Sequence, residues 1–166
     1  MPVIAETFAT CDPVWSDLRE EAVRMAAAEP ALASFVHATI LNHERLEEAL
    51  SYHLAQKLGN DDMGAMQVRQ VFDQAFAGAP QIGEDVRADL SAIFERDPAV
   101  NSYVEPFLFF KGFHALQSYR IMHWLWLKGR KAMALHFQSR ISEVFGLDVH
   151  PAARVGRGVM IDHGTG

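Results

Sequence analysis

The sequence has few cysteines, and it lacks long apolar runs and excess positive charge. Each shortage excludes a class of protein. Cys11 is the only cysteine among 166 residues, which excludes an internal disulfide and a zinc site built from several cysteines. The net charge of -6 and the isoelectric point of about 5.7 argue against a general nucleic-acid-binding protein.

The apolar runs are too short to cross a membrane, which needs roughly 18–20 residues. Lys111 interrupts PFLFF and Lys128 interrupts IMHWLWL. The N-terminus has no basic start followed by an apolar run, so it does not read as a signal peptide. We therefore expect no membrane association and a cytoplasmic location.

Several functional motifs are also missing from the sequence. It contains no phosphate-binding glycine loop, no dinucleotide fingerprint and no Gly-x-Ser-x-Gly elbow. The histidines show no metal-binding pair: His43-Glu44, for example, has no second histidine four residues after His43. We expect no bound metal.

What is present is helical periodicity over most of a chain long enough for one domain. Asp12-Pro13 predicts a helix start and Glu29-Pro30 its end. Asp61-Asp62 is expected to cap the fourth helix, and Gly129 to cap the sixth. In all we expect about seven helices: one from Pro13, apolar stripes over 32–41 and 46–58, then segments over 66–76, 86–94, 106–127 and 130–145.

After Gly146 the helical pattern stops. Val149, Val155 and Ile161 recur every six residues among small residues and glycines. A six-residue period is typical of a parallel β-helix, in which the aliphatic residue of each hexapeptide points into the core. We therefore expect a helical domain over 1–146 and the beginning of a β-helix over 147–166. Because the sequence stops in mid-repeat, we hypothesise that it is a fragment.

Two places could carry chemistry. Asp162-His163 lies in a glycine-rich turn, with Asp148 shortly before it, and a histidine beside a carboxylate can act as a general base. The alternative is that His163 and Asp148 are surface residues of turns. Their spacing does not establish contact, since a coil of this kind holds about eighteen residues and position 145, not 148, would stack over His163. Asp97, before a proline, could bind an ammonium group or could simply end a helix.

Other conspicuous residues are expected to pack. His114, Tyr119 and His123 read as core or interface residues. Trp124 and Trp126 read as packing residues. The leucines of 46–58 read as core or subunit interface. The basic excess of residues 101–166 fits either solvated helix faces or a surface that meets an anionic ligand.

Four segments closely resemble bacterial serine O-acetyltransferases, and together they span nearly the whole chain. The resemblance implies an N-terminal helical domain followed by a left-handed parallel β-helix of hexapeptide repeats. It implies transfer of acetyl from acetyl-CoA, a co-substrate and not a bound cofactor, to the hydroxyl of L-serine. The segments are FVHATILNH (35–43), RDPAV (96–100), LFFKGFHALQSYRIMHWLW (108–126) and DVHPAARVGRGVMIDHGTG (148–166).

The resemblance also assigns roles. His163 matches the general base and Asp148 the carboxylate that orients it. Asp97 and Asp162 match acids of the serine site, where L-cysteine binds as feedback inhibitor. The family has alanine or a similar small residue where this chain has Gly164, a change we expect to be tolerated.

Assembly and partners follow from the same resemblance. The family forms a dimer of trimers, with the β-helices making the trimers and the helical domains pairing them. The later coils, which hold most CoA contacts and the groups for the serine carboxylate, are absent here, as is the C-terminal tail that docks into cysteine synthase. Two alternatives stay open: a different acceptor such as homoserine or a sugar, or a helical assembly module without turnover.

Overall fold

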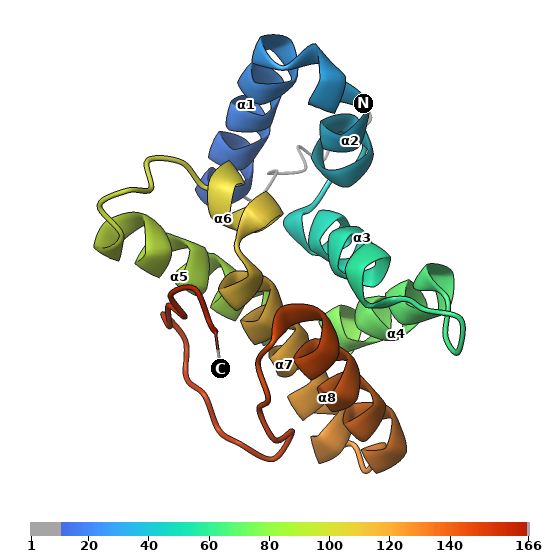
Figure 1. The fold of residues 1–166 in the computed structure, drawn as a ribbon. Helices are drawn as coiled ribbons and strands as arrows, with labels where there is room; N and C mark the ends of the chain where they lie inside the picture. Colours follow the sequence, from blue (N-terminus) through green and yellow to red (C-terminus); the bar gives the residue numbers. More distant parts are fainter. Residues whose placement is uncertain (1–10, 166) are drawn as a thin grey trace, which may run out of the picture.

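The computed structural model describes residues 11–165, and these are mostly helical (Figure 1). Residues 1–10, on which most of the signal-peptide argument rests, and Gly166 lie outside the described residues. Eight α-helices occur in the described part: α1 (Pro13–Ala28), α2 (Ala33–Val36), α3 (Leu46–Leu58), α4 (Ala65–Gly78), α5 (Gln81–Arg96), α6 (Val104–Phe109), α7 (Lys111–Leu127) and α8 (Lys131–Phe145).

Several helix ends lie where the sequence predicts them. The side chain of Asp12 accepts a hydrogen bond from the amide of Trp15 at 3.2 Å, and Pro13 occupies the first turn of α1. Gly129 has φ +75° directly after the C-cap of α7, and Gly146 has φ +74° directly after α8. The predicted helix over 32–41 is instead a 3-10 turn (Pro30–Leu32), α2 and a π-helix (His37–Leu41).

The predicted cap of the fourth helix is wrong. α4 begins at Ala65 after Gly64, whose amide donates to the side chain of Gln67. Asp61 and Asp62 lie in the exposed turn before it, because the side chain of Asn60 accepts from the amides of Asp62 and Met63.

The predicted sixth helix is two helices, which accounts for eight helices where about seven are expected. The chain is extended at Phe110 (φ -90°, ψ 109°), between α6 and α7. Two buried histidines satisfy the carbonyls before this break: His53 donates to Leu108 at 3.1 Å and His114 donates to Phe107 at 2.8 Å. The break therefore depends on tertiary contacts.

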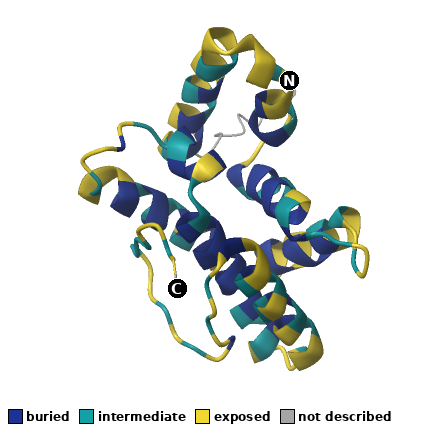
Figure 2. Cartoon of the chain, in the orientation of Figure 1, coloured by how far each residue is buried: buried dark blue, intermediate teal, exposed yellow. Residues whose placement is uncertain are grey.

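The core is centred on α7. Twelve of its residues are buried, so other parts of the molecule surround it on nearly every side (Figure 2). It packs against α4, α5, α6 and α8. His114 and Tyr119 are buried, while His123, Trp124 and Trp126 are half-buried, as the packing interpretation expects.

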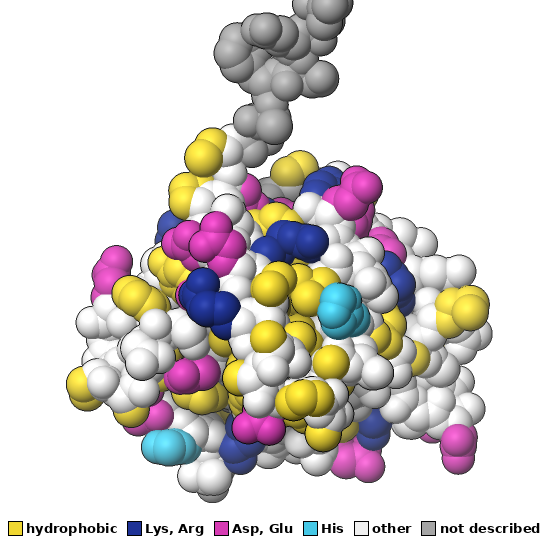
Figure 3. All heavy atoms as spheres, turned by 90° about the horizontal axis from the view of Figure 1, so that it is seen from above, with side chains coloured by type: hydrophobic (Ala, Val, Ile, Leu, Met, Phe, Trp, Pro, Cys, Tyr) yellow, Lys and Arg dark blue, Asp and Glu magenta, His cyan; other side chains and the backbone are white. Residues whose placement is uncertain are grey.

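The end of the molecule made by α1 and α2 carries exposed hydrophobic side chains, among them Val23, Leu32 and Phe35. Figure 3 views the molecule from this end and shows hydrophobic surface interspersed with charges of both signs. None of the described helices is both long and apolar enough to span a bilayer.

Residues 147–165 follow an irregular path along the helices and contain no strand. The expected hexapeptide residues Val149, Val155 and Ile161 nevertheless line one apolar cavity, together with Ala115 and Leu116 of α7. The helical part of the expected fold is thus confirmed, while no β-structure is present in the described residues.

Candidate active site

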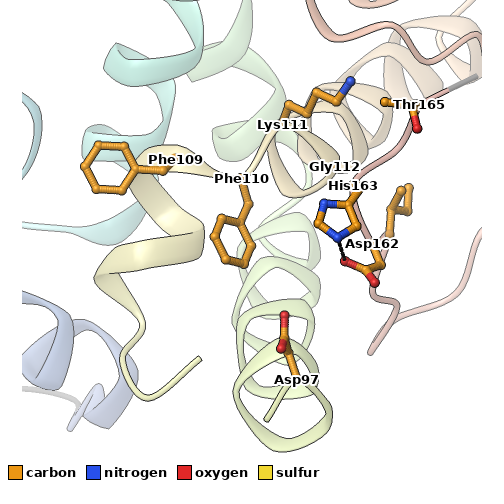
Figure 4. A pocket seen from close by; sticks show the side chains of 9 residues that line it. Asp97, Phe109, Phe110, Lys111, Gly112, Asp162, His163 and Thr165 are labelled. Atoms are coloured by element: carbon orange, nitrogen blue, oxygen red, sulfur yellow. Dashed lines mark ion pairs between the residues drawn. The ribbon is translucent and has the colours of Figure 1, made fainter. Parts of the chain in front are cut away.

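A pocket of about 260 Å³ opens where three distant parts of the chain meet (Figure 4). The end of α5 contributes Asp97. The junction between α6 and α7 contributes one wall, and residues 147–165, which we call the C-terminal segment, contribute the other. The lining residues are Asp97, Phe109, Phe110, Lys111, Gly112, Ile161, Asp162, His163 and Thr165.

His163 lies in an unusual backbone conformation. Its φ is +55°, the only positive φ of a non-glycine residue in 11–165, and Gly164 follows with φ +62°. The amide of Gly164 donates to the carbonyl of Asp162 at 2.6 Å, which closes a tight turn around His163. A left-handed histidine costs roughly 1–2 kcal/mol, and such strain concentrates at functional sites.

Asp162 and His163 form a histidine–carboxylate pair in the pocket. Nε2 of His163 lies 3.4 Å from Oδ1 of Asp162. Their side chains are 87% and 62% exposed, so both remain open to a ligand. A carboxylate at this distance stabilises an imidazolium, which is what a histidine becomes when it accepts a proton.

Asp97 faces the pair from the other side of the pocket (Figure 4). It is the C-cap of α5, and its Oδ1 accepts from the amide of Ala99 at 2.9 Å. This turn contact holds the carboxylate in place at the edge of the pocket. Two carboxylates around one small pocket suit a ligand with an ammonium group.

Gly112 allows the C-terminal segment to approach α7. A Cβ at Gly112 would collide with the carbonyl oxygen of Ile161 and lie 3.2 Å from the Ile161 Cβ. The backbone before Asp162 therefore rests directly on the first turn of α7. Only glycine permits this distance.

The pocket wall from Phe109 to Gly112 was not among the sequence-predicted site residues. One signal was available, because an isolated glycine inside a helical pattern, here Gly112, can have a packing or functional reason. The partner of that approach, Ile161, lies far along the chain, and local patterns do not identify it.

Asp148 is not in this pocket. Its Oδ1 accepts from Nε2 of Gln138 at 3.0 Å, and it lines a separate hollow on α8. The structure thus brings together Asp97, Asp162 and His163 but places Asp148 elsewhere. Among residues 11–165 no cluster of three potential metal ligands exists.

The fold and the pocket together define a helical domain that presents a histidine–carboxylate pair suited to general-base chemistry. A family model described as "Serine acetyltransferase, N-terminal" matches residues 14–118. The chain belongs to the serine acetyltransferase family.

Known serine acetyltransferases are similar in sequence and structure to most of this chain. Serine acetyltransferase of Salmonella typhimurium is 51% identical over 153 residues, which make up 92% of this chain and 56% of that relative. The structure of Neisseria gonorrhoeae serine acetyltransferase in complex with serine has a TM-score of 0.91 and 52% identity, covering 95% of this chain and 65% of that one.

Two further solved serine acetyltransferases, one in complex with CoA and one with cysteine, each have a TM-score of 0.91 and 49% identity. The match covers 92% of this chain in both cases, and 65% and 64% of the respective structures. The chain therefore spans between 56% and 65% of the length of these relatives.

Proposed function

We propose that this chain is part of a serine O-acetyltransferase, which converts acetyl-CoA and L-serine to O-acetyl-L-serine and CoA in the first step of cysteine biosynthesis. The observation that carries the proposal is the pocket shared by Asp97, Asp162 and His163. Identity near 50% to serine acetyltransferases, one of them solved with serine and another with CoA, supports it.

In the proposed reaction, His163 takes the proton of the serine hydroxyl while that oxygen attacks the thioester carbonyl of acetyl-CoA. The new C–O bond forms, the C–S bond breaks, and the thiolate of CoA receives the proton from the imidazolium. Asp162, 3.4 Å from His163 Nε2, stabilises the imidazolium. Asp97 and Asp162 pair with the amino group of serine, and of cysteine as inhibitor.

Asp148 is proposed to orient His163 only in the complete assembly, because in the single chain it binds Gln138. If so, Asp148→Asn in the longest chain that the source gene encodes (the long chain) lowers kcat and shifts its pH profile. An unchanged rate and profile would remove Asp148 from the site.

The remaining expectations concern the whole protein. Residues 1–146 would form the helical domain and 147–166 the first part of a left-handed β-helix. The described residues of that part, 147–165, contain no strand, because β-helix strands form only by hydrogen bonding between successive coils. The exposed side chains Val23, Leu32 and Phe35 offer apolar surface for the pairing of helical domains within a dimer of trimers. Cysteine synthase would bind a tail outside this chain, and the cytoplasm remains the expected compartment.

The proposal is tested by serine-dependent release of CoA from acetyl-CoA, with homoserine as a parallel acceptor, on the long chain and on residues 1–166. We expect the long chain to turn over with serine and the short chain to be silent, since His163 is 87% exposed in it. A long chain that prefers homoserine would support the alternative acceptor. One that ignores both, yet forms defined oligomers, would support the assembly module.

A further inference from the structure

A buried ion pair joins α5 to α7 beside the C-terminal segment. Asp89 is fully buried and Arg120 is 6% exposed. Nε and Nη2 of Arg120 donate to the Asp89 carboxylate over 2.8–3.0 Å, and Gln117 Nε2 donates to it at 2.9 Å. Apolar residues can replace such a pair with little loss of stability, so stability alone does not explain why the pair is present.

Both partners of the pair also bind backbone groups of the C-terminal segment. Oδ1 of Asp89 accepts from the amide of Val159 at 2.9 Å. Nη2 of Arg120 donates to the carbonyl of Gly156 at 2.7 Å. The pair therefore binds the segment at two residues, Gly156 and Val159, through charge-assisted hydrogen bonds.

Tyr119, next to Arg120 on α7, makes two further hydrogen bonds to the backbone of the segment, both between neutral groups. Its hydroxyl donates to the carbonyl of Ala153 and accepts from the amide of Val155 at 3.2 Å. Nδ1 of His123, one turn further along α7, donates to the carbonyl of Pro151 at 2.7 Å. Side chains of the helical domain thus bind the backbone of a segment that forms no strand of its own.

We infer that Asp89, Tyr119 and Arg120, which we call the docking cluster, are positioning residues for His163. Val159 is held by Asp89, Ile161 rests on Gly112, and His163 follows two residues later. A shift of the segment at Val159 therefore moves the imidazole relative to Asp97. The inference rests on the proposed function for its catalytic consequence, but not for the docking itself.

The mildest test of docking is Tyr119→Phe, which removes one hydroxyl and leaves no buried charge unpaired. We expect amide hydrogen exchange at residues 153–163 to quicken at least ~3-fold, as befits the loss of one hydrogen-bonding group. Tyr52→Phe is the matched control, because the ring of Tyr52 lies tilted against His43 and under the guanidinium of Arg69, away from the segment. Unchanged exchange in Tyr119→Phe would overturn the docking role.

A stronger test replaces the whole pair, Asp89→Leu with Arg120→Met, so that no lone charge stays buried. In the long chain we expect kcat with serine to fall roughly 10- to 100-fold, the scale of a misplaced catalytic group, while the KM for acetyl-CoA changes less than about 2-fold. The single variant Arg120→Lys, which keeps Asp89, should have a kcat between those of the pair variant and the wild type. A lysine keeps the positive charge but cannot make the two directed hydrogen bonds of the guanidinium.

Arg87→Met separates positioning from stability. Arg87 also lies on α5 and pairs with Asp12 and Glu47 at 2.6 Å each, but these contacts join α1 and α3 and not the C-terminal segment. We expect it to lower the melting temperature and leave kcat unchanged at temperatures where the protein is folded. Equal losses of kcat in Arg87→Met and in the pair variant would overturn positioning.

The two proposals can fail separately. A wild-type long chain without serine turnover would reject the proposed function. Exchange at 153–163 in the variants would then still decide whether the docking cluster holds the segment.

Discussion

At the scale of single residues, the site depends on two consecutive left-handed positions. His163 has φ +55° and Gly164 φ +62°, and together they turn the imidazole toward the pocket. The glycine-rich turn around His163 was readable in the sequence, and it did identify a candidate base. The conformation itself was not readable, because it depends on how Ile161 rests on α7.

Asp97→Asn keeps the hydrogen bond to the amide of Ala99 but removes the charge that pairs with an ammonium group. In the long chain we expect the KM for serine and the inhibition constant for cysteine to rise at least ~10-fold, as befits loss of a charged hydrogen bond. The KM for acetyl-CoA should stay within about 2-fold. Steady-state kinetics with each substrate varied in turn checks this, and equal losses for both substrates would contradict it.

Gly112→Ala places a methyl group against the carbonyl oxygen of Ile161. We expect a loss of stability of about 1–3 kcal/mol, the usual cost of overpacking, or a displaced segment with lower activity. Thermal unfolding and serine turnover measure the two outcomes. Gly64→Ala is the control, since a Cβ there has nothing within 4 Å, and it should change stability by less than about 1 kcal/mol. Identical behaviour of the two variants would count against the close approach.

At the scale of helices, the sequence predicted those helix ends that are set by capping residues next to them in the chain. Asp12-Pro13 started α1, and glycines followed α7 and α8, because capping involves only neighbouring residues. The break at Phe110 was missed. The residue at the break is a phenylalanine, and neither proline nor glycine stands there as a local signal. The carbonyls that the break leaves without helical partners accept hydrogen bonds from His53 of α3 and His114 of α7.

Because of these two histidines, we expect the stability of the folded protein to depend on pH in the acid range. Burial lowers the pKa of His53 to about 4, and burial together with the nearby His53 lowers the pKa of His114 to about 3. Both rings are neutral in the folded protein, whereas in the unfolded chain they bind protons near pH 6.5. The unfolded state therefore gains protons first, and stability falls as the pH drops from about 6.5 toward 4.

Urea unfolding at several pH values checks this prediction. His53→Gln can still donate to the carbonyl of Leu108 but cannot titrate, so we expect a shallower loss of stability between pH 6.5 and 4. His43→Gln is the control, because His43 is only half-buried and bonds to Ala38 within its own turn. Parallel pH curves for the wild type and His53→Gln would show that His53 does not contribute.

At the scale of the whole molecule, the helical architecture was predictable from periodicity, since 3.6-residue stripes persist through most of the chain. The six-residue spacing of Val149, Val155 and Ile161 predicted a shared apolar face, and these residues do line one cavity. The position of Asp148 was not predictable in the same way. Its partner in the single chain is Gln138 of α8, a contact that the spacing of the hexapeptides does not indicate.

The central claim is that His163 is the base of a serine acetyltransferase, and the most direct test is kcat of His163→Ala in the long chain. We predict a loss of at least ~10²-fold, the lower end of what a general base supplies, with the fold retained by circular dichroism. His150→Ala is the control: His150 lies in the same segment but packs on Trp126 outside the pocket, and its removal should leave kcat close to that of the wild type. A His163→Ala enzyme that keeps near-full serine turnover would contradict the account.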